Sequence, residues 1–166
     1  ECDWSSDVCS SDLLMRKGRH DIGFVVDPDA DRLALVCEDG TMFGEENTLV
    51  AVADYVLQHT PGNTVSNLSS SRGLRDVTEK HGCNYAPAAV GEVNVVTKMK
   101  ETGAVIGGEG NGGVIYPAAH SGRDALVGIA LILTHLAKLG CKASELRDSL
   151  PQYCISKNRI DLNPTT

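Results

Sequence analysis

The sequence predicts an α/β fold, with two α/β units whose mixed sheets are flanked by helices. Short apolar segments bounded by turn residues alternate with longer segments whose apolar residues recur at helical spacing. Glycine or a Pro-Gly pair follows several of the longer segments, as is typical of helix ends. No internal repeat or low-complexity tract interrupts this alternation. The alternation of strand-like and helix-like segments is therefore the main evidence for the fold class.

The first unit is predicted to begin with two strands around an acidic loop. Residues 21–27, DIGFVVD, are typical of a buried strand, and residues 32–38, RLALVCE, of a second strand that turns at Asp39 and Gly40. Residues 44–59 place apolar side chains on one helical face, and the TPGN segment that follows ends this helix.

A second unit is predicted to begin after residue 60, with extended and helical segments in alternation. The expected strands are 64–69, 83–88, 104–108 and 114–117, and the expected helices are 72–82, 92–103, 122–140 and 143–150. Residues 122–140 are apolar almost all the way round, which predicts a buried helix. Ser144 is expected at the N-cap of the last helix, and residues 152–162 are expected to form a strand.

The first thirteen residues, ECDWSSDVCSSDL, differ in composition from the rest of the chain. They contain the only Trp, two of the six Cys and four acids, without any Lys or Arg. They lack the basic start and apolar centre of a signal peptide. We interpret residues 1–13 as the translation of a sequencing adapter joined to a gene fragment, with a disordered acidic tail as the alternative.

Charge and hydropathy narrow the classes of partner. The formal net charge of -7 argues against general nucleic-acid binding, and no run of about 18 apolar residues is present to cross a membrane. The four cysteines after residue 13 show no metal-ligand or redox spacing, which predicts reduced thiols in a cytoplasmic protein. Small molecules are therefore the expected partners.

The segment FVVDPDADRLALV holds the most distinctive charge pattern in the chain. Asp27, Asp29 and Asp31 stand on alternate positions directly after an apolar strand, with Arg32 beside them. Three carboxylates within five residues repel one another, and a hard divalent cation such as Mg²⁺ or Ca²⁺ compensates that charge. A solvated acidic turn is the alternative without a ligand.

Two other site classes fit this segment less well. An EF-hand loop would place its last ligand at Glu38, but Arg32 occupies the position that needs glycine and the flanks are strand-like. A haloacid-dehalogenase-type phosphatase would use Asp27 as nucleophile and Asp29 as acid and base, but its motif has Thr or Val where Asp31 stands.

Two motifs together resemble the α-D-phosphohexomutase family of phosphoglucomutases, phosphomannomutases and phosphoglucosamine mutases. DPDADR at 27–32 is similar to the metal-binding loop of that family, usually D-G-D-[GA]-D-R. GGEGNGG at 107–113 resembles its sugar-recognition loop, commonly G-E-x-S-G-H. The similarity runs from about residue 21 to residue 160, and phosphoglucosamine mutase is the first member for comparison.

The resemblance implies a role for each motif residue. Asp27, Asp29 and Asp31 would hold Mg²⁺ against a phosphoserine of an earlier domain, and Arg32 would face the transferring phosphoryl group or the substrate. Glu109 and Asn111 would hydrogen-bond hydroxyl groups of a sugar phosphate. Taken alone, residues 106–116 could equally form an ordinary hairpin with an Asn-Gly turn.

The sequence also departs from the family pattern. Gly113 stands where relatives commonly have His, and Ser69 where some have Lys. Glu92 aligns with a residue that is His in some relatives and a proposed general acid and base, a role open to a carboxylate. A first-turn acid that interacts with the helix dipole is the alternative for Glu92.

Other polar side chains carry weaker predictions. The five histidines show no ligand spacing and are expected at the surface or at helix caps, with His120 lying near the glycine-rich segment. Ser69, Ser70 and Ser71 are expected to cap a helix. Asp124 is expected as a first-turn acid, and Arg123 is a weak candidate for substrate contact.

The resemblance implies a fragment of a four-domain phosphohexomutase. Residues 14–60 would end the metal-binding second domain, residues 61–150 would form the sugar-binding third domain, and residues 151–166 would lead towards a missing fourth domain. The sequence has no T-[AS]-S-H-N-P-like segment for the phosphoserine, which would lie in a missing first domain, so we expect this chain alone to be inactive. A stand-alone module that binds Ca²⁺ or a sugar phosphate without catalysis is the alternative.

Overall fold

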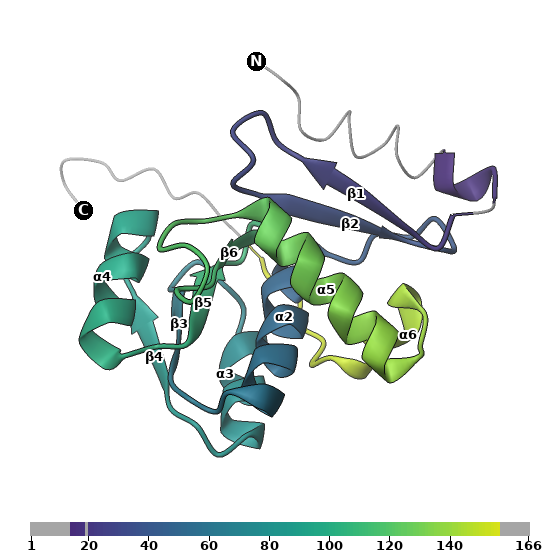
Figure 1. The fold of residues 1–166 in the computed structure, drawn as a ribbon. Coiled ribbons are helices and arrows are strands. Elements are labelled where there is room, and N and C mark those ends of the chain that lie inside the picture. Colours follow the sequence, from purple (N-terminus) through teal and green to yellow (C-terminus); the bar gives the residue numbers. More distant parts are fainter. Residues whose placement is uncertain (1–13, 19, 157–166) are drawn as a thin grey trace, which may run out of the picture.

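The computed structural model describes residues 14–18 and 20–156, and two sheets organise them (Figure 1). The interpretations of residues 1–13 and of residues 157–166 lie outside the described residues. In chain order the elements are β1 (Ile22–Val26), β2 (Leu33–Cys37), α2 (Glu45–His59), β3 (Thr64–Asn67), α3 (Gly73–Lys80), β4 (Tyr85–Ala88), α4 (Glu92–Thr102), β5 (Ile106–Glu109), β6 (Gly113–Ile115), α5 (Ala125–Leu139) and α6 (Ala143–Ser149).

The first sheet is an antiparallel hairpin of β1 and β2. Ile22 pairs with Cys37 at one end and Val26 pairs with Leu33 at the other, so the acidic residues 27–32 form the connecting loop. Every residue of β2 is buried, whereas β1 is mostly half-buried. The continuous apolar run of β2 explains this difference, since a strand covered on both faces needs apolar side chains at every position.

The second sheet has the strand order β4-β3-β5-β6. Strand β3 runs parallel to β4 and β5, while β6 returns antiparallel to β5. The carboxyl ends of β3, β4 and β5 therefore lie along one edge, which is where ligands bind in open α/β sheets. This edge brings Asn67, Glu109 and the start of α4 towards the acidic loop.

Helices cover both faces of this sheet (Figure 1). Helix α4 packs on one face through Val95 and Met99, which belong to a small apolar cluster with Val65. Helices α2 and α3 cover the other face, and α5 packs against both α2 and β2. The main core joins side chains of β2, α2, α5 and α6 in one cluster, so the hairpin and the larger sheet share a hydrophobic core. The expected α/β class with mixed, helix-flanked sheets is confirmed.

Helix α5 is less buried than its composition predicts. Ala125, Gly128, Ile132 and His135 are buried, but Leu126 and Leu133 expose 66% and 43% of their surface. The prediction of a helix buried on all sides is therefore wrong, because no described residue covers the outer face. In the part of the chain that the structure describes, no single helix could span a membrane, and α5 and α6 meet the length and composition criteria only as a pair bent by 91°.

Two local predictions near the carboxyl end are also wrong. The N-cap of α6 is Lys142 rather than Ser144, and the backbone N–H of Lys142 donates to Glu145 Oε2 at 2.8 Å. Ser144 instead donates from its hydroxyl to Glu38, which ties α6 to the end of β2. Residues 152–156 form no strand, and the rest of the strand expected there lies outside the described residues.

Candidate functional site

The acidic loop, residues 27–32, is a tight turn organised by Asp27. The side-chain Oδ1 of Asp27 accepts the backbone N–H groups of Asp31 at 3.0 Å and Arg32 at 3.1 Å. Its backbone carbonyl accepts the N–H of Ala30 at 3.0 Å. Ala30 closes the turn in the left-handed region with φ of 57°. The first aspartate therefore sets the loop conformation as well as carrying charge.

The three aspartates converge as the sequence predicts. One carboxylate oxygen from each of Asp27, Asp29 and Asp31 lies within 4.8 Å of the others. Asp31 Oδ1 is buried and accepts no hydrogen bond in the structure. Arg32 Nε lies 3.7 Å from this oxygen, beyond hydrogen-bond distance. A buried carboxylate oxygen without a donor fits a hard cation with oxygen ligands, so these residues suit Mg²⁺ or Ca²⁺.

The carboxylates of Asp27 and Asp31 differ in pKa. Partial burial raises the pKa of Asp31, and the neighbouring Asp27 carboxylate raises it further. Burial acts upward on the pKa of Asp27 as well. The backbone N–H of Arg32, the side chain and backbone N–H of Asp31, and the charge of Arg32 together outweigh burial and lower the pKa of Asp27. Repulsion between the two groups is thus only partly compensated by protein atoms.

The glycine-rich loop, residues 109–113, presents a buried carboxylate. Glu109 Oε1 accepts a hydrogen bond from Asn67 Nδ2 at 2.6 Å. Asn67 Oδ1 accepts the hydroxyl of Ser70 at 2.7 Å, and the Ser70 hydroxyl accepts the N–H of Gly110 at 2.9 Å. The end of β3 therefore fixes both the carboxylate and the backbone of this loop.

Arg123, just before α5, contacts carboxylates from three separate segments. Its Nη1 lies 2.6 Å from Glu109 Oε2, and its Nη2 forms an ion pair with Asp31. Its Nε lies 3.4 Å from Glu92 Oε2, and its backbone N–H donates to Glu92 Oε1 at 3.0 Å. This one side chain joins the acidic loop, the glycine-rich loop and the start of α4.

The structure therefore brings most of the predicted residues together. Glu92 and Glu109 both contact Arg123. Arg32 ends the acidic loop beside Asp27, with 44% of its side chain exposed. Asn111 points its Oδ1 into its own turn, where it accepts the N–H of Gly113 at 3.3 Å. The catalytic and binding roles of these side chains stay predictions.

Sequence reasoning did not identify Asn67 and Ser70 as site residues and gave Arg123 little weight. Asn67 ends β3, which runs parallel to β5, and Glu109 ends β5, so the two side chains leave the same edge of the sheet. The expected strands 64–69 and 104–108 place both residues near strand ends, and this common edge is the signal that could have found Asn67. Ser70 was expected to cap α3, whereas its hydroxyl joins Asn67 to Gly110. Nothing in the sequence places Arg123 between the two loops.

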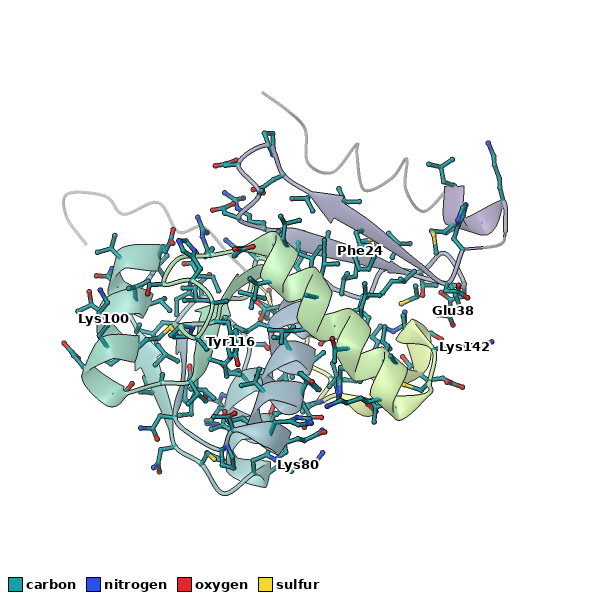
Figure 2. The ribbon with its side chains drawn as sticks, in the orientation of Figure 1. Phe24, Glu38, Lys80, Lys100, Tyr116 and Lys142 are labelled. Carbon is teal, nitrogen blue, oxygen red and sulfur yellow. The ribbon has the colours of Figure 1, made fainter. Side chains whose placement is uncertain are left out.

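The EF-hand interpretation is wrong for this loop. Strands β1 and β2 flank the acidic loop, where an EF-hand has helices. Glu38, which would be its last ligand, lies at the opposite end of β2, near Lys142 (Figure 2). There its carboxylate accepts the N–H of Ser144 at 3.2 Å.

Comparison with known proteins gives consistent matches. Residues 45–153 match the family described as phosphoglucomutase/phosphomannomutase, alpha/beta/alpha domain III. The match starts at the first residue of α2 and thus before residue 61, where the second unit was expected to start. That domain boundary stays a prediction.

Curated relatives and a solved structure each match at least four fifths of the chain. A phosphoglucomutase/phosphomannomutase of Thermococcus kodakarensis is 38% identical over 134 residues, which are 80% of this chain and 29% of that protein. A probable phosphoglucosamine mutase of Methanopyrus kandleri is 31% identical over 85% of this chain and 31% of its own length. A phosphoglucomutase/phosphomannomutase family protein of Burkholderia thailandensis superposes with a TM-score of 0.80 at 28% identity, over 89% of this chain and 32% of the other. The chain spans about a third of the length of these relatives.

Proposed function

This chain belongs to the phosphoglucomutase/phosphomannomutase family, and we propose on that premise that it supplies the Mg²⁺-binding loop and the sugar-recognition loop of a phosphohexomutase. Such an enzyme moves a phosphoryl group between the 1- and 6-positions of a hexose or hexosamine phosphate through a phosphoserine. Glucosamine phosphate is the first candidate substrate, because several similar proteins are phosphoglucosamine mutases.

One observation carries the proposal. The acidic loop, with a buried carboxylate oxygen that lacks a donor, and the glycine-rich loop, with the buried Glu109, share the guanidinium of Arg123. A phosphoryl group held at the first loop and a sugar hydroxyl held at the second would therefore be neighbours. Proximity of this kind is the main requirement for phosphoryl transfer.

The chemistry of each side chain suits it to a different role in phosphoryl transfer. Asp27, Asp29 and Asp31 would hold Mg²⁺, which when bound neutralises charge on the phosphoryl oxygens. Arg32 is partly exposed, and its guanidinium can donate to phosphoryl oxygens at the mouth of the loop. Glu92, whose side chain is 36% exposed, would take up or return the proton of the attacking or leaving hydroxyl.

Sugar recognition falls to the glycine-rich loop. Glu109 has one donor on each carboxylate oxygen, so each oxygen keeps a lone pair that can accept a sugar hydroxyl. No described residue accepts from Asn111 Nδ2, so this amide can donate to a hydroxyl oxygen. The phosphoserine has to come from residues outside this sequence, so we expect no turnover by the chain alone.

Calorimetric titration of the purified chain with MgCl₂ and CaCl₂ tests the metal assignment. We expect Mg²⁺ to bind weakly and to bind more tightly when glucosamine 6-phosphate is present, because Mg²⁺ commonly takes phosphate oxygens as ligands. Asp29→Asn should abolish this binding, since Asp29 supplies one of the three converging oxygens. Asp39→Asn is the matched control, because Asp39 serves a separate turn with Thr41.

Each of three results would contradict a part of the proposal. Unchanged Mg²⁺ binding in Asp29→Asn would exclude the acidic loop as the site, and Ca²⁺ binding without any response to sugar phosphate would favour the non-catalytic module. Turnover of glucose, mannose or glucosamine phosphates by the purified chain would show that the expectation of inactivity is wrong.

A further inference from the structure

Arg123 is placed to link two loops that otherwise recognise different ligands. We propose that Arg123 is a positioning residue that transmits a change of charge at Asp31 in the acidic loop to Glu109 in the glycine-rich loop. The inference rests on the roles proposed for the two loops, because it makes cation binding and sugar binding depend on each other. Its test needs neither ligand.

The contacts of Arg123 support a bridge of fixed geometry. The guanidinium donates from separate nitrogens to Asp31 and to Glu109, so both loops contact one rigid planar group. Its side chain is 14% exposed and that of Glu109 is 5% exposed, so solvent screens this contact only weakly. Glu92 holds the base of the same side chain through the Arg123 backbone N–H.

The shape of the glycine-rich loop makes room for this arginine. A Cβ atom at Gly113 would lie 2.5 Å from Arg123 Cδ and 3.2 Å from Cγ. Any side chain at position 113 would therefore push the arginine stem out of its place. The α-D-phosphohexomutases commonly have His at the position of Gly113. In this chain the glycine leaves the space that the Arg123 side chain occupies.

The two carboxylate oxygens of Asp31 have different surroundings, and this difference explains how a cation at the acidic loop would affect Glu109. Asp31 directs Oδ2 at Arg123 and leaves the buried Oδ1 without a donor. A cation at Oδ1 would withdraw charge from the whole carboxylate and weaken its pull on the guanidinium. The guanidinium would then pair more strongly with Glu109 and change the position of that carboxylate for a sugar hydroxyl.

A second route between the loops runs through the backbone and has to be separated from Arg123. The N–H of Leu33 donates to the carbonyl of Gly112 at 3.1 Å, which joins the end of the acidic loop to the glycine-rich loop directly. If this backbone bond carried the coupling, removing the arginine side chain would leave the coupling intact. The two routes therefore give opposite results in an Arg123 variant.

Amide NMR spectra of the metal-free chain in EDTA test the proposal. Asp31→Asn removes the charge that a cation would neutralise, and we expect it to shift the amide resonances of residues 109–113. In the Arg123→Gln background the same substitution should leave those resonances in place. Arg123→Lys should behave like Arg123→Gln, because one ammonium group cannot bridge the carboxylates as the guanidinium fork does. Arg75→Gln is the matched control, since Arg75 pairs with Asp76 and Glu79 within α3.

Each outcome decides the question. Loss of the long-range shift in both Arg123 variants, with its retention in Arg75→Gln, supports the proposal. Persistence of the shift in Arg123→Gln, or its absence in the wild-type background, overturns it. If Arg123→Gln does not fold, Gly113→Ala displaces the arginine without removing it and should abolish the shift equally. Failure here would leave the Mg²⁺ titration unaffected, so the two proposals fail separately.

Discussion

Ala30 is the one non-glycine residue with positive φ among the described residues, and it lies in the middle of the acidic loop. At φ of 57° its Cβ crowds the backbone, which costs about 1–2 kcal/mol for an L-residue. The N–H of Ala125 donates to the Ala30 carbonyl at 3.0 Å, so α5 helps to hold this conformation. The strain is therefore stored in the segment that carries the three aspartates.

Ala30→Gly is expected to stabilise the chain. Glycine removes the left-handed strain but adds freedom to the unfolded chain, so the net gain should be about 0.5–1 kcal/mol in the free energy of unfolding. Ala137→Gly, on the exposed side of α5, is the control and should cost about 1 kcal/mol. Urea unfolding measures both, and a loss of similar size in the two variants would contradict the assignment of strain to Ala30.

Three helices meet at a buried carboxylate that the sequence did not single out. Asp54 of α2 lies 2.8 Å from His81 Nε2 at the end of α3 and 3.6 Å from His135 Nε2 of α5. Interaction with His135 is the largest cause that lowers the pKa of Asp54 to about 2, and it acts against burial. His135 is 1% exposed, so the expectation that every histidine lies at the surface or at a cap is wrong for this one.

The lowered pKa of Asp54 predicts a loss of stability in acid. Because the folded pKa lies below the unfolded value of 3.8, the stabilisation is complete well above pH 4 and is lost as the pH falls towards 2. This group alone should account for about 1 kcal/mol of lost unfolding free energy between pH 6 and pH 3. Urea unfolding of wild type and Asp54→Asn at both pH values measures this contribution.

Thr134→Ala is the control for that pH series, since it changes an uncharged side chain on the neighbouring α5. It should follow the pH dependence of wild type, whereas Asp54→Asn should show a weaker dependence. Equal pH dependence in all three proteins would show that Asp54 does not contribute to acid sensitivity.

The bounds of a helix or strand can be predicted from the sequence where its local pattern of apolar residues determines them. The apolar run before Asp27 and the period of apolar residues in 44–59 predict β1 and α2 close to their observed bounds. The outer face of α5 could not be predicted, because composition reports apolar side chains without reporting what covers them. The N-cap at Lys142 was missed because Ser144 makes its contact with Glu38, far away in the sequence.

At the scale of the whole molecule, the site depends on contacts that local patterns do not encode. The two motifs in 27–32 and 107–113 were predictable, since each has its own charge and glycine pattern. Their meeting at Arg123 was not, because it requires the hairpin to pack against the edge of the larger sheet. The sequence therefore indicated the components of the site, and the tertiary packing of β2 against α2 and α5 places them together.

Gly112, in the loop between β5 and β6, accepts a hydrogen bond from the backbone N–H of Leu33 at the start of β2, and it allows a direct test of how the site is assembled. It has φ of 88°, and a Cβ atom there would lie 2.4 Å from the carbonyl oxygen of Leu33. Gly112→Ala should therefore add a backbone clash to the left-handed strain, at a cost of about 3 kcal/mol in unfolding free energy. Gly82→Ala is the matched control, because Gly82 has φ of 69° with no atom within 4 Å of the added Cβ.

The difference between the two variants isolates the contact between hairpin and sheet. Gly82→Ala should lower the free energy of unfolding by only about 1–2 kcal/mol. Its hydrogen exchange in β1 and β2 should stay as slow, relative to the rest of the chain, as in wild type. Gly112→Ala should speed exchange selectively in the hairpin, because the Leu33 N–H loses its partner when the glycine-rich loop moves away. Equal losses and equal exchange patterns would mean that the shared core of β2, α2 and α5 holds the two loops together without this contact. Selective opening of the hairpin would show that the backbone junction at Gly112 keeps the acidic loop within reach of Glu109.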